Sequence, residues 1–487
     1  MNLDTKACYR ALKSRDARFD GRFFTAVLST GIYCRPVCPA PTPKAENCRF
    51  YPCAAAAEDA GFRPCLRCRP ETSPGTPAWM GTSATVARAL KLIHEGGLDG
   101  GSVEGLAGRL GIGGRHLRRL FFDYFGASPL AVAQSRRVHF AKTLIDETRL
   151  PMSEVAFSAG FKSVRRFNDA VRATYGRPPR DLRLSSRHLP PEGNGAHLTL
   201  RLSFRSPMAW GEMMEFLSAR ATPGVEAVES GCYRRTVEID GARGIIDVWP
   251  SDRGHDLHLR IPSELSRGLK RIADGARNLF DLDADPARIN EVLGRDKTLA
   301  PLVASCPGLR VPGAFDPFEV VVRAILGQQV TVRAATTLAG RLAERFGDPF
   351  ESGEKGLMRI FPRPDVLARA RLAGIGLPAA RAAAIRRLAA AVTAGDVILD
   401  GAGGADRAAE ELTGIPGIGE WTASYVGMRA FREPDAFPAG DLGLRHALGA
   451  RSDLPGRREI LARAEAWRPW RAYAAMHLWR RGTRRSR

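Results

Sequence analysis

Four cysteines near the N-terminus have the paired spacing of metal ligands: Cys34-x3-Cys38 and Cys65-x2-Cys68. Seven of the nine cysteines lie within the first 68 residues. In a chain whose thiols stay reduced, close pairs favour four thiolates around one tetrahedral Zn²⁺ over disulfides. A domain of about 70 residues gains much of its stability from such a site. The spacing therefore predicts one zinc ion whose simplest role is structural, and metal-free thiols are the alternative.

A glycine-rich segment in the C-terminal half could bind a phosphate. Residues 412–423 read LTGIPGIGEWTA, and three glycines there permit a tight turn between two helices: Gly414, Gly417 and Gly419. Backbone N–H groups that face outward from such a turn suit one DNA phosphate. We expect Ile415 and Ile418 to pack the hairpin.

A carboxylate follows this hairpin. Asp441 lies twenty residues after Trp421, in FPAGDLGLRHAL, at the predicted start of a helix. Alone, such an Asp is most simply a helix N-cap. Beside a phosphate-binding turn, the same carboxylate is more simply interpreted as part of a functional site. Trp421 and Tyr425 share one helix face, and a place in the core is the simplest interpretation of such a pair in a generic helix.

Residues 83–180 contain a helical repeat. Ala107-x3-Gly111 in the first copy corresponds to Ala156-x3-Gly160 in the second. A small residue four positions before a glycine is what two helices require when they cross steeply through a short turn. The repeat therefore predicts two helix-turn-helix units in tandem.

Charge and composition limit the class of protein. The chain has 487 residues and a net charge of +21, and residues 1–190 hold 30 basic and 16 acidic side chains, or +14. A basic folded chain favours a polyanionic partner, because each neutralised phosphate releases counterions; an Arg-rich proteome is the alternative. No apolar run reaches the roughly 18 residues of a membrane span, and MNLDTKACYR lacks the features of a secretory signal. We expect a cytoplasmic protein with no membrane partner.

The chain is too long for one core, and its patterns predict a multidomain α+β and mostly α protein. Pro and Gly cluster at 70–81 and 190–195, which predicts linkers there. Strand-like stretches occupy 198–262, and helical patterns continue from Phe315 onward. The predicted domains are a small zinc domain, a tandem helix-turn-helix domain, an α/β lobe and an all-α domain: 1–76, 82–185, 196–308 and 309–482.

The first domain resembles a known family. GIYCRPVCPA, AENCRFY and GFRPCLRC are similar to the N-terminal domain of Ada-type adaptive-response proteins, in which a zinc-bound cysteine takes a methyl group from a DNA methylphosphotriester. The resemblance implies that Cys34 is the methyl acceptor and that Cys38, Cys65 and Cys68 complete the zinc shell. Zinc would then be both structural and catalytic. A four-thiolate site can approach a methylated phosphate because that phosphate is neutral.

The helical repeat, which ends in GASP and GRPP, resembles the DNA-binding domain of AraC-type regulators. This implies recognition helices near Gly114–Tyr124 and from Lys162–Arg166. Partners would be a promoter operator and RNA polymerase. Candidates for phosphate or major-groove contacts, with simple solvation as the alternative for each, are Arg115, His116, Arg118, Lys162, Arg165 and Arg166.

Residues 197–482 resemble helix-hairpin-helix base-excision glycosylases of the AlkA-like 3-methyladenine type. RVPGAFDPFEVVVRAILGQQVTV, GIGEWTASYV and WRPWRAYAAMHLW carry this resemblance. It implies that Asp441 is the catalytic carboxylate and that Gln329 lies where the family inserts a wedge into the duplex. Gly417 and Gly419 would bind DNA. It further implies an aromatic base pocket of Trp421, Tyr425, Trp479 and Phe216, and a monovalent cation on the carbonyls of Thr413, Ile415 and Ile418.

The chemistry expected of these residues is hydrolysis of a glycosidic bond. An alkylated purine is cationic, so its glycosidic bond is already labile and the enzyme need not protonate the leaving base. What remains is to flip the nucleotide out of the duplex, stack the base on electron-rich rings and stabilise the positive charge that develops at C1′. Bifunctional glycosylases of this superfamily, which also cut the DNA strand, carry a lysine at the position of Trp421. We therefore expect this chain to hydrolyse the glycosidic bond without cutting the strand. The predicted function is DNA alkylation repair by a monomer acting on double-stranded DNA, with methyl transfer to Cys34 and transcription regulation that depends on this methylation. The alternative is a transcription regulator whose C-terminal block binds DNA without catalysis.

Overall fold

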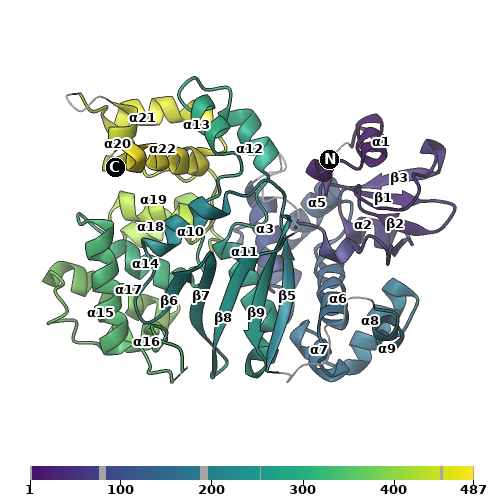
Figure 1. Ribbon diagram of the computed structural model, residues 1–487, viewed down its shortest axis with the longest axis horizontal. Coiled ribbons are helices and arrows are strands. Elements are labelled where there is room, and N and C mark those ends of the chain that lie inside the picture. The colour runs from purple at the N-terminus through teal and green to yellow at the C-terminus, as the bar shows by residue number, and fades with distance from the viewer. Residues whose placement is uncertain are drawn as a thin grey trace.

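The computed structural model describes residues 3–75, 84–186, 196–252, 254–351, 353–449 and 453–485. In Figure 1 a small sheet near the N-terminus lies at the right, a larger sheet in the middle, and the helices of the C-terminal half at the left. The molecule is multidomain, as predicted. In the described residues, no helix combines the length and apolarity needed to cross a membrane.

The N-terminal domain is built on a four-stranded sheet. Its elements are α1 (Thr5–Ser14), η1 (Ala17–Phe19), β1 (Phe24–Val27), β2 (Ile32–Cys34), η2 (Ala45–Asn47), β3 (Cys48–Tyr51), α2 (Ala54–Asp59), β4 (Arg63–Pro64) and η3 (Pro70–Thr72). The strand order is β3-β1-β2-β4, with β2 and β4 parallel and the other pairs antiparallel. Tyr33 is fully buried in this sheet, and its hydroxyl donates to Glu58 at 2.7 Å.

The helical repeat folds as two helix pairs on either side of a long helix. The helices are α3 (Ala84–His94), α4 (Val103–Arg109), α5 (Gly114–Phe125), α6 (Pro129–Glu147), α7 (Met152–Ser158), α8 (Val164–Tyr175) and α9 (Pro179–Leu184). Gly111 and Gly160 turn the chain between the paired helices with φ of +72° and +85°, a conformation that favours glycine. Helix α5 covers the predicted first recognition helix, and α8 begins within the stretch predicted for the second.

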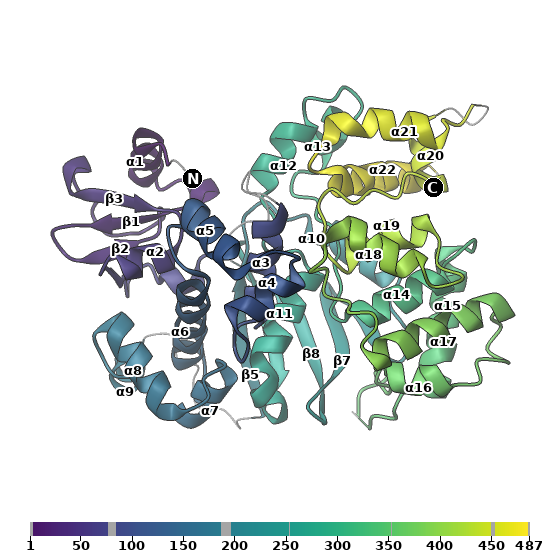
Figure 2. The same ribbon diagram turned by 180° about the vertical axis from the view of Figure 1, so that it is seen from behind.

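A five-stranded antiparallel sheet forms the centre of the molecule. Its lobe contains β5 (His197–Ser203), α10 (Trp210–Ser218), β6 (Glu226–Glu229), β7 (Cys232–Ile239), β8 (Ala242–Pro250), β9 (Asp256–Pro262), η4 (Ser263–Gly268), α11 (Leu269–Leu279), α12 (Pro286–Leu293) and α13 (Ala300–Ser305). The strand order is β5-β9-β8-β7-β6. Leu257, Leu259 and Ile261 alternate along β9 and are fully buried, because one face of the sheet packs against the core. Figure 2 shows α3, α4 and α11 in front of this sheet.

The rest of the chain is helical, as predicted. Its elements are α14 (Pro317–Leu326), α15 (Val332–Phe346), α16 (Pro364–Arg369), α17 (Ala379–Ala394), α18 (Gly404–Thr413), α19 (Glu420–Arg429), α20 (Leu442–Leu448), α21 (Arg457–Ala464), η5 (Glu465–Trp467) and α22 (Arg471–Arg485). Two hydrophobic clusters hold these helices. One is built around α14, α15, α17 and α19, and the other around α20 to α22.

Composition predicts a linker at 70–81, and this prediction is wrong for residues 70–75. Pro70–Thr72 form η3, and Glu71 is buried between Arg69 and Lys142, whose nitrogens lie 3.2 and 3.6 Å from its carboxylate. The fold of this segment depends on α6 covering it, and a three-residue helix leaves no periodic signal in the sequence. Residues 76–81 and the second predicted linker, 190–195, lie outside the described residues.

Buried polar contacts join the parts of the molecule. Arg205, before α10, donates to the carbonyls of Asp20 and Asp283 at 3.1 and 3.3 Å. Lys91 of α3 donates to the Phe431 carbonyl at 2.9 Å. Glu147, at the end of α6, accepts from the Arg201 guanidinium of β5 at 2.8 Å. The zinc domain, the helical repeat and the C-terminal half are therefore packed on one another.

Candidate functional sites

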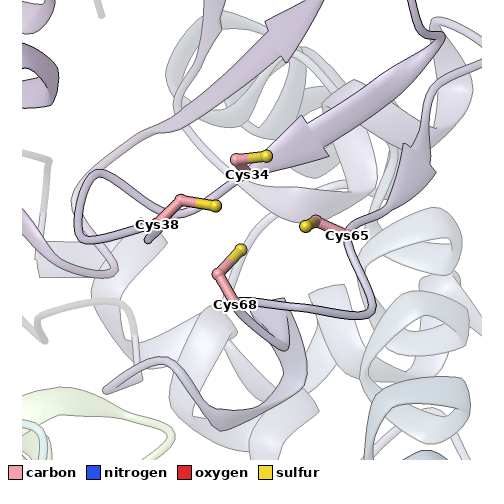
Figure 3. Close-up of side chains that lie close together, drawn as sticks. All are labelled: Cys34, Cys38, Cys65 and Cys68. Atoms are coloured by element: carbon pink, nitrogen blue, oxygen red, sulfur yellow. The ribbon is translucent and has the colours of Figure 1, made fainter. Parts of the chain in front are cut away.

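The four predicted zinc ligands come together because two parallel strands end side by side. Tyr33 of β2 pairs with Pro64 of β4, so Cys34, the last residue of β2, and Cys65, the first residue after β4, lie side by side at one end of the sheet. Cys38 and Cys68 follow three or four residues later, in turns that point back at them (Figure 3). All four sulfurs lie within 4.8 Å of one another. Tetrahedral zinc with Zn–S bonds of ~2.3 Å holds sulfurs ~3.8 Å apart, so this donor set fits zinc.

Arg35 fixes the geometry around these thiols. Its backbone N–H donates to Cys68 Sγ at 3.4 Å, and its guanidinium donates to the Cys68 carbonyl at 3.2 Å and to Thr72 Oγ1 at 2.8 Å. The same guanidinium pairs with buried Asp20. A donor to a sulfur ligand favours its thiolate form and fixes its orientation.

The other cysteines of the first domain stand apart from this site. Burial raises the pKa of the Cys53 thiol to about 12 and that of Cys8 to about 11. Cys53 Sγ donates to the Phe125 carbonyl of α5 at 3.3 Å. These thiols therefore stay protonated and act as small core residues.

Basic side chains are exposed at the starts of both predicted recognition helices. Arg118 pairs with Glu104 of α4 at 2.6 Å, an exposed pair that contributes little free energy and can be exchanged for a phosphate. Of the six candidates for DNA contacts, His116 is half-buried, and its Nδ1 lies 3.0 Å from Arg119 Nη2. The exposed candidates are Arg115, Arg118, Lys162, Arg165 and Arg166.

The predicted hairpin joins α18 to α19. Gly417 has φ of +100°, and a Cβ there would lie 2.7 Å from Ala384 Cβ, so the turn requires glycine. Gly419 is the N-cap residue of α19, and both glycines are exposed. Ile415 and Ile418 are buried beneath the turn, as predicted, and Ile418 N–H donates to the Ile415 carbonyl at 3.0 Å. The N–H end of α19 is thus presented to solvent beside the turn.

Asp441 is held by three donors. As N-cap of α20, its Oδ1 accepts from Leu444 N–H at 3.0 Å and from Trp479 Nε1–H at 2.8 Å. Its Oδ2 accepts from Trp421 Nε1–H at 3.0 Å. The two indoles come from helices α19 and α22, so the carboxylate is fixed between segments far apart in the sequence. The N-cap role and a role in the site are both satisfied by one side chain.

Asp441 lies at a cavity of about 370 Å³. Trp421, Tyr425 and Trp479, the aromatics expected of a base pocket, line it together with Asp441. The rings of Trp421 and Tyr425 are stacked with centroids 5.4 Å apart and planes 15° apart, and Tyr425 and Trp479 lie 6.3 Å apart. The cavity therefore has an aromatic wall and one carboxylate, a combination suited to a flat ring attached to a sugar.

Phe216 was expected to form another wall of this pocket, and the structure places a different side chain there. The Arg220 guanidinium carbon lies 3.8 Å from the centroid of the Phe216 ring, and that of Arg429 lies 4.9 Å from it. Arg220, not Phe216, is among the residues that line the cavity. The ring of Phe216 therefore supports a cation instead of facing a ligand directly.

Gln329 lies in the turn between α14 and α15 with φ of +52°, an uncommon conformation for a residue other than glycine. It is exposed, and its neighbour Val330 lines the cavity mouth. Gln328 ties this turn to the hairpin, since its Nε2 donates to the Gly417 carbonyl at 2.9 Å and to Thr422 Oγ1 at 3.0 Å. The wedge candidate, the hairpin and the cavity thus share one face.

Sequence reasoning missed the arginines of the pocket. Arg429 Nη1 donates to the Tyr425 hydroxyl at 2.7 Å. Burial raises the pKa of Tyr425, but the charges of Arg429 and Arg220 and the hydrogen bond from Arg429 leave it below 10. Arg220 and Arg429 lie four residues after Phe216 and Tyr425 respectively. On α19 that i, i+4 spacing could have indicated Arg429. Arg220 lies two residues beyond the end of α10, where helical spacing gives no such signal.

Four family models match the chain, each over one part of it. They are described as the metal binding domain of Ada (residues 7–71), a helix-turn-helix domain (106–185), the AlkA N-terminal domain (199–316) and the HhH-GPD superfamily of base excision DNA repair proteins (322–472). Together, the fold and these family matches define the class of the protein. It is a DNA repair protein in which a helix-hairpin-helix base-excision enzyme is joined to a zinc-binding domain and a DNA-binding domain.

Individual proteins match over different lengths. A probable bifunctional transcriptional activator/DNA repair enzyme AlkA of Mycobacterium tuberculosis is 43% identical over 98% of this chain and 97% of its own length. DNA-3-methyladenine glycosylase 2 of Escherichia coli is 35% identical over 57% of this chain and 95% of its own length. The structure of a 3-methyladenine DNA-glycosylase from Archaeoglobus fulgidus, 24% identical, covers 58% of this chain and 98% of itself with a TM-score of 0.51, which shows a shared fold.

The chain belongs to the family of bifunctional Ada/AlkA-type transcriptional activators and DNA repair enzymes. It therefore combines a DNA glycosylase of the helix-hairpin-helix superfamily with a zinc-binding Ada-type domain, and DNA is its partner.

Proposed function

We propose that the C-terminal half excises alkylated purines such as 3-methyladenine from DNA, with Asp441 as the catalytic carboxylate. The observation that carries the proposal is the carboxylate clamped by the indole N–H groups of Trp421 and Trp479 at the cavity. The relatives named as 3-methyladenine glycosylases add support. Hairpin residues Gly417 and Gly419 bind a phosphate beside the lesion, and Gln329 fills the space that the flipped nucleotide leaves.

The residues divide the chemistry between them. Trp421 and Tyr425 stack on the base and hold it out of the duplex. The C1′–N bond breaks with both electrons leaving on the base, and the Asp441 carboxylate stabilises the positive charge on the sugar. Water then adds to C1′ and gives up a proton. Glycosylases that also cut the strand carry a lysine at the position of Trp421. A tryptophan cannot form the covalent imine, so the strand stays intact.

The test is incubation of the full chain with a duplex that carries one 7-methylguanine. We expect an abasic site that breaks only on later treatment with alkali. Direct strand breakage by the protein would contradict the hydrolytic assignment. An undamaged duplex of the same sequence is the control.

We further propose that Cys34 accepts a methyl group from DNA methylphosphotriesters. Support comes from the match to the metal binding domain of Ada and from the four-sulfur cluster. Zinc bound by Cys34, Cys38, Cys65 and Cys68 would keep the thiols ionised. The Cys34 sulfur attacks the methyl carbon, the O–CH3 bond breaks, and the phosphate leaves as an ordinary diester. Mass mapping after incubation with methylated DNA should find one added methyl group, on Cys34; methylation of another cysteine would overturn the assignment.

The remaining assignments concern partners and a second ion. We propose that Arg115, Arg118, Lys162 and Arg165 hold a promoter operator, that RNA polymerase is recruited there, and that the protein is a monomer. A monovalent cation bound by the carbonyls of Thr413, Ile415 and Ile418 would strengthen the phosphate site of the hairpin. The rival, a regulator with an inactive C-terminal block, would need Asp441 only as the N-cap of α20 and would not account for its two indole donors at an aromatic cavity.

A further inference from the structure

Three arginines reach the cavity that holds Asp441: Arg220, Arg323 and Arg429. A site for cationic bases alone would be better served by carboxylates, because like charges repel. Each arginine therefore needs an explanation from its own partners.

Two of the three are satisfied by protein groups. Arg323 Nη1 lies 2.7 Å from Glu226 and 3.0 Å from Glu319, so its charge is balanced by buried carboxylates. Arg429 donates to the Pro312 and Gly313 carbonyls at 2.6 and 3.1 Å and to the Tyr425 hydroxyl. These contacts account for its Nε, Nη1 and Nη2, which makes Arg429 a brace between α19 and the loop before α14.

Arg220 is different. It follows α10, stacks on Phe216, and its Nη1 donates to the Phe216 carbonyl at 3.3 Å. Among the described residues, no carboxylate forms an ion pair with it. Its burial lowers the pKa of the guanidinium, as does the neighbouring charge of Arg429, although Tyr425 opposes this shift. A guanidinium has five N–H donors, so after its hydrogen bonds to the Phe216 carbonyl and to the Tyr425 side chain Arg220 retains donors for a ligand in the cavity.

We propose that Arg220 is a specificity-determining residue that donates hydrogen bonds to the acceptor edge of an uncharged flipped base. It would favour neutral damaged bases that carry a carbonyl group, such as hypoxanthine, over cationic alkylpurines. This rests on the proposed glycosylase function of the same cavity. A cationic base leaves as a neutral molecule and gains nothing from a nearby cation.

The benefit to a neutral base arises in bond cleavage. When the C1′–N9 bond breaks, both electrons go to the base, which becomes an anion with its charge spread over ring nitrogens and the carbonyl oxygen. Arg220 stabilises that anion more than the uncharged base. Water supplies hydroxide to C1′, and its remaining proton neutralises the departed base.

The experiment compares single-turnover excision by the full chain from two duplexes, one with hypoxanthine and one with 7-methylguanine. Arg220→Met should slow hypoxanthine release about ten- to hundredfold, the range of one hydrogen bond to a charged group, while 7-methylguanine release changes less than about threefold or rises. Arg220→Lys, which keeps the charge, should recover part of the loss. Arg288→Met, at an exposed arginine of α12 outside the cavity lining, is the matched control and should change neither rate.

The outcomes separate this inference from the proposed function. Equal loss on both duplexes in a variant with wild-type thermal stability would make Arg220 a general support for the pocket and overturn the inference. Wild-type release of 7-methylguanine without release of hypoxanthine would also overturn it and leave the proposed function intact. Release of neither base would refute the proposed function itself. Only a selective loss on hypoxanthine supports the assignment.

Discussion

Replacing Asp441 by Asn should separate catalysis from stability, because the carboxylate accepts three hydrogen bonds. The amide oxygen can keep Leu444 N–H and Trp479 Nε1–H, which both contact Oδ1. The amide NH2 then takes the place of Oδ2, 3.0 Å from Trp421 Nε1–H, so two donors face each other. We expect Asp441→Asn to lower the free energy of unfolding by about 1–3 kcal/mol, and to slow base release by about 10²-fold or more.

A second change tests whether the two losses have different causes. Trp421→Phe removes the opposing indole N–H and keeps an aromatic ring, so adding it to Asp441→Asn should restore part of the lost stability without restoring base release. Urea denaturation and single-turnover excision on all four members of the mutant cycle measure both quantities. Near-wild-type excision by Asp441→Asn would refute the catalytic assignment. Recovery of activity in the double variant would show that the single variant was merely misfolded.

Three further predictions concern the N-terminal half: loss of a zinc ligand, methylation of Cys34, and loss of a buried charge. Cys65→Ala and Cys68→Ala should each abolish both zinc binding and methyl acceptance; stoichiometric zinc by atomic absorption in either would contradict the ligand set. Methylating Cys34 reduces the net charge of a four-thiolate zinc site from −2 to −1, so operator affinity should rise about tenfold at low salt and less at high salt; equal titration curves would exclude a charge switch. Burial raises the pKa of Glu71, but the charges of Lys142 and Arg69 outweigh burial and leave that pKa below 4.5. The ionised carboxylate therefore stabilises the fold fully at pH above its unfolded pKa, and this stabilisation is lost as the pH falls through the lower folded pKa. Glu71→Gln should therefore cost about 3–5 kcal/mol at pH 7, and a deficit by denaturation that did not shrink in acid would refute this account.

Features that depend on local spacing were predictable from the sequence. The cysteine pairs, the glycine turns of the helical repeat and the buried isoleucines of the hairpin follow from residues close in the chain, and the structure brings each set together as expected. Asp441 beside Trp421 and Trp479 could be predicted only through resemblance, since the three lie on separate helices.

Features that depend on contact between distant segments were not predictable. Residues 70–75 have the composition of a linker, yet Pro70–Thr72 pack against α6, and nothing in their own sequence indicates that partner. The sequence predicts Phe216 as an aromatic of the pocket, but the guanidinium groups of Arg220 and Arg429 lie against its ring, and Arg429 comes from the distant helix α19. The abundance of arginine concealed Arg220 and Arg429 in the sequence, because many of the described arginines lie on the surface or in ion pairs.

The most direct test of the account is chromatography of the free bases released from methylated DNA by the full-length protein. We predict free 3-methyladenine from the wild-type chain, in proportion to abasic sites in otherwise intact strands, and about 10²-fold slower release by Asp441→Asn. A protein that binds this DNA and releases no base would contradict the central claim and favour a regulator with an inactive C-terminal block.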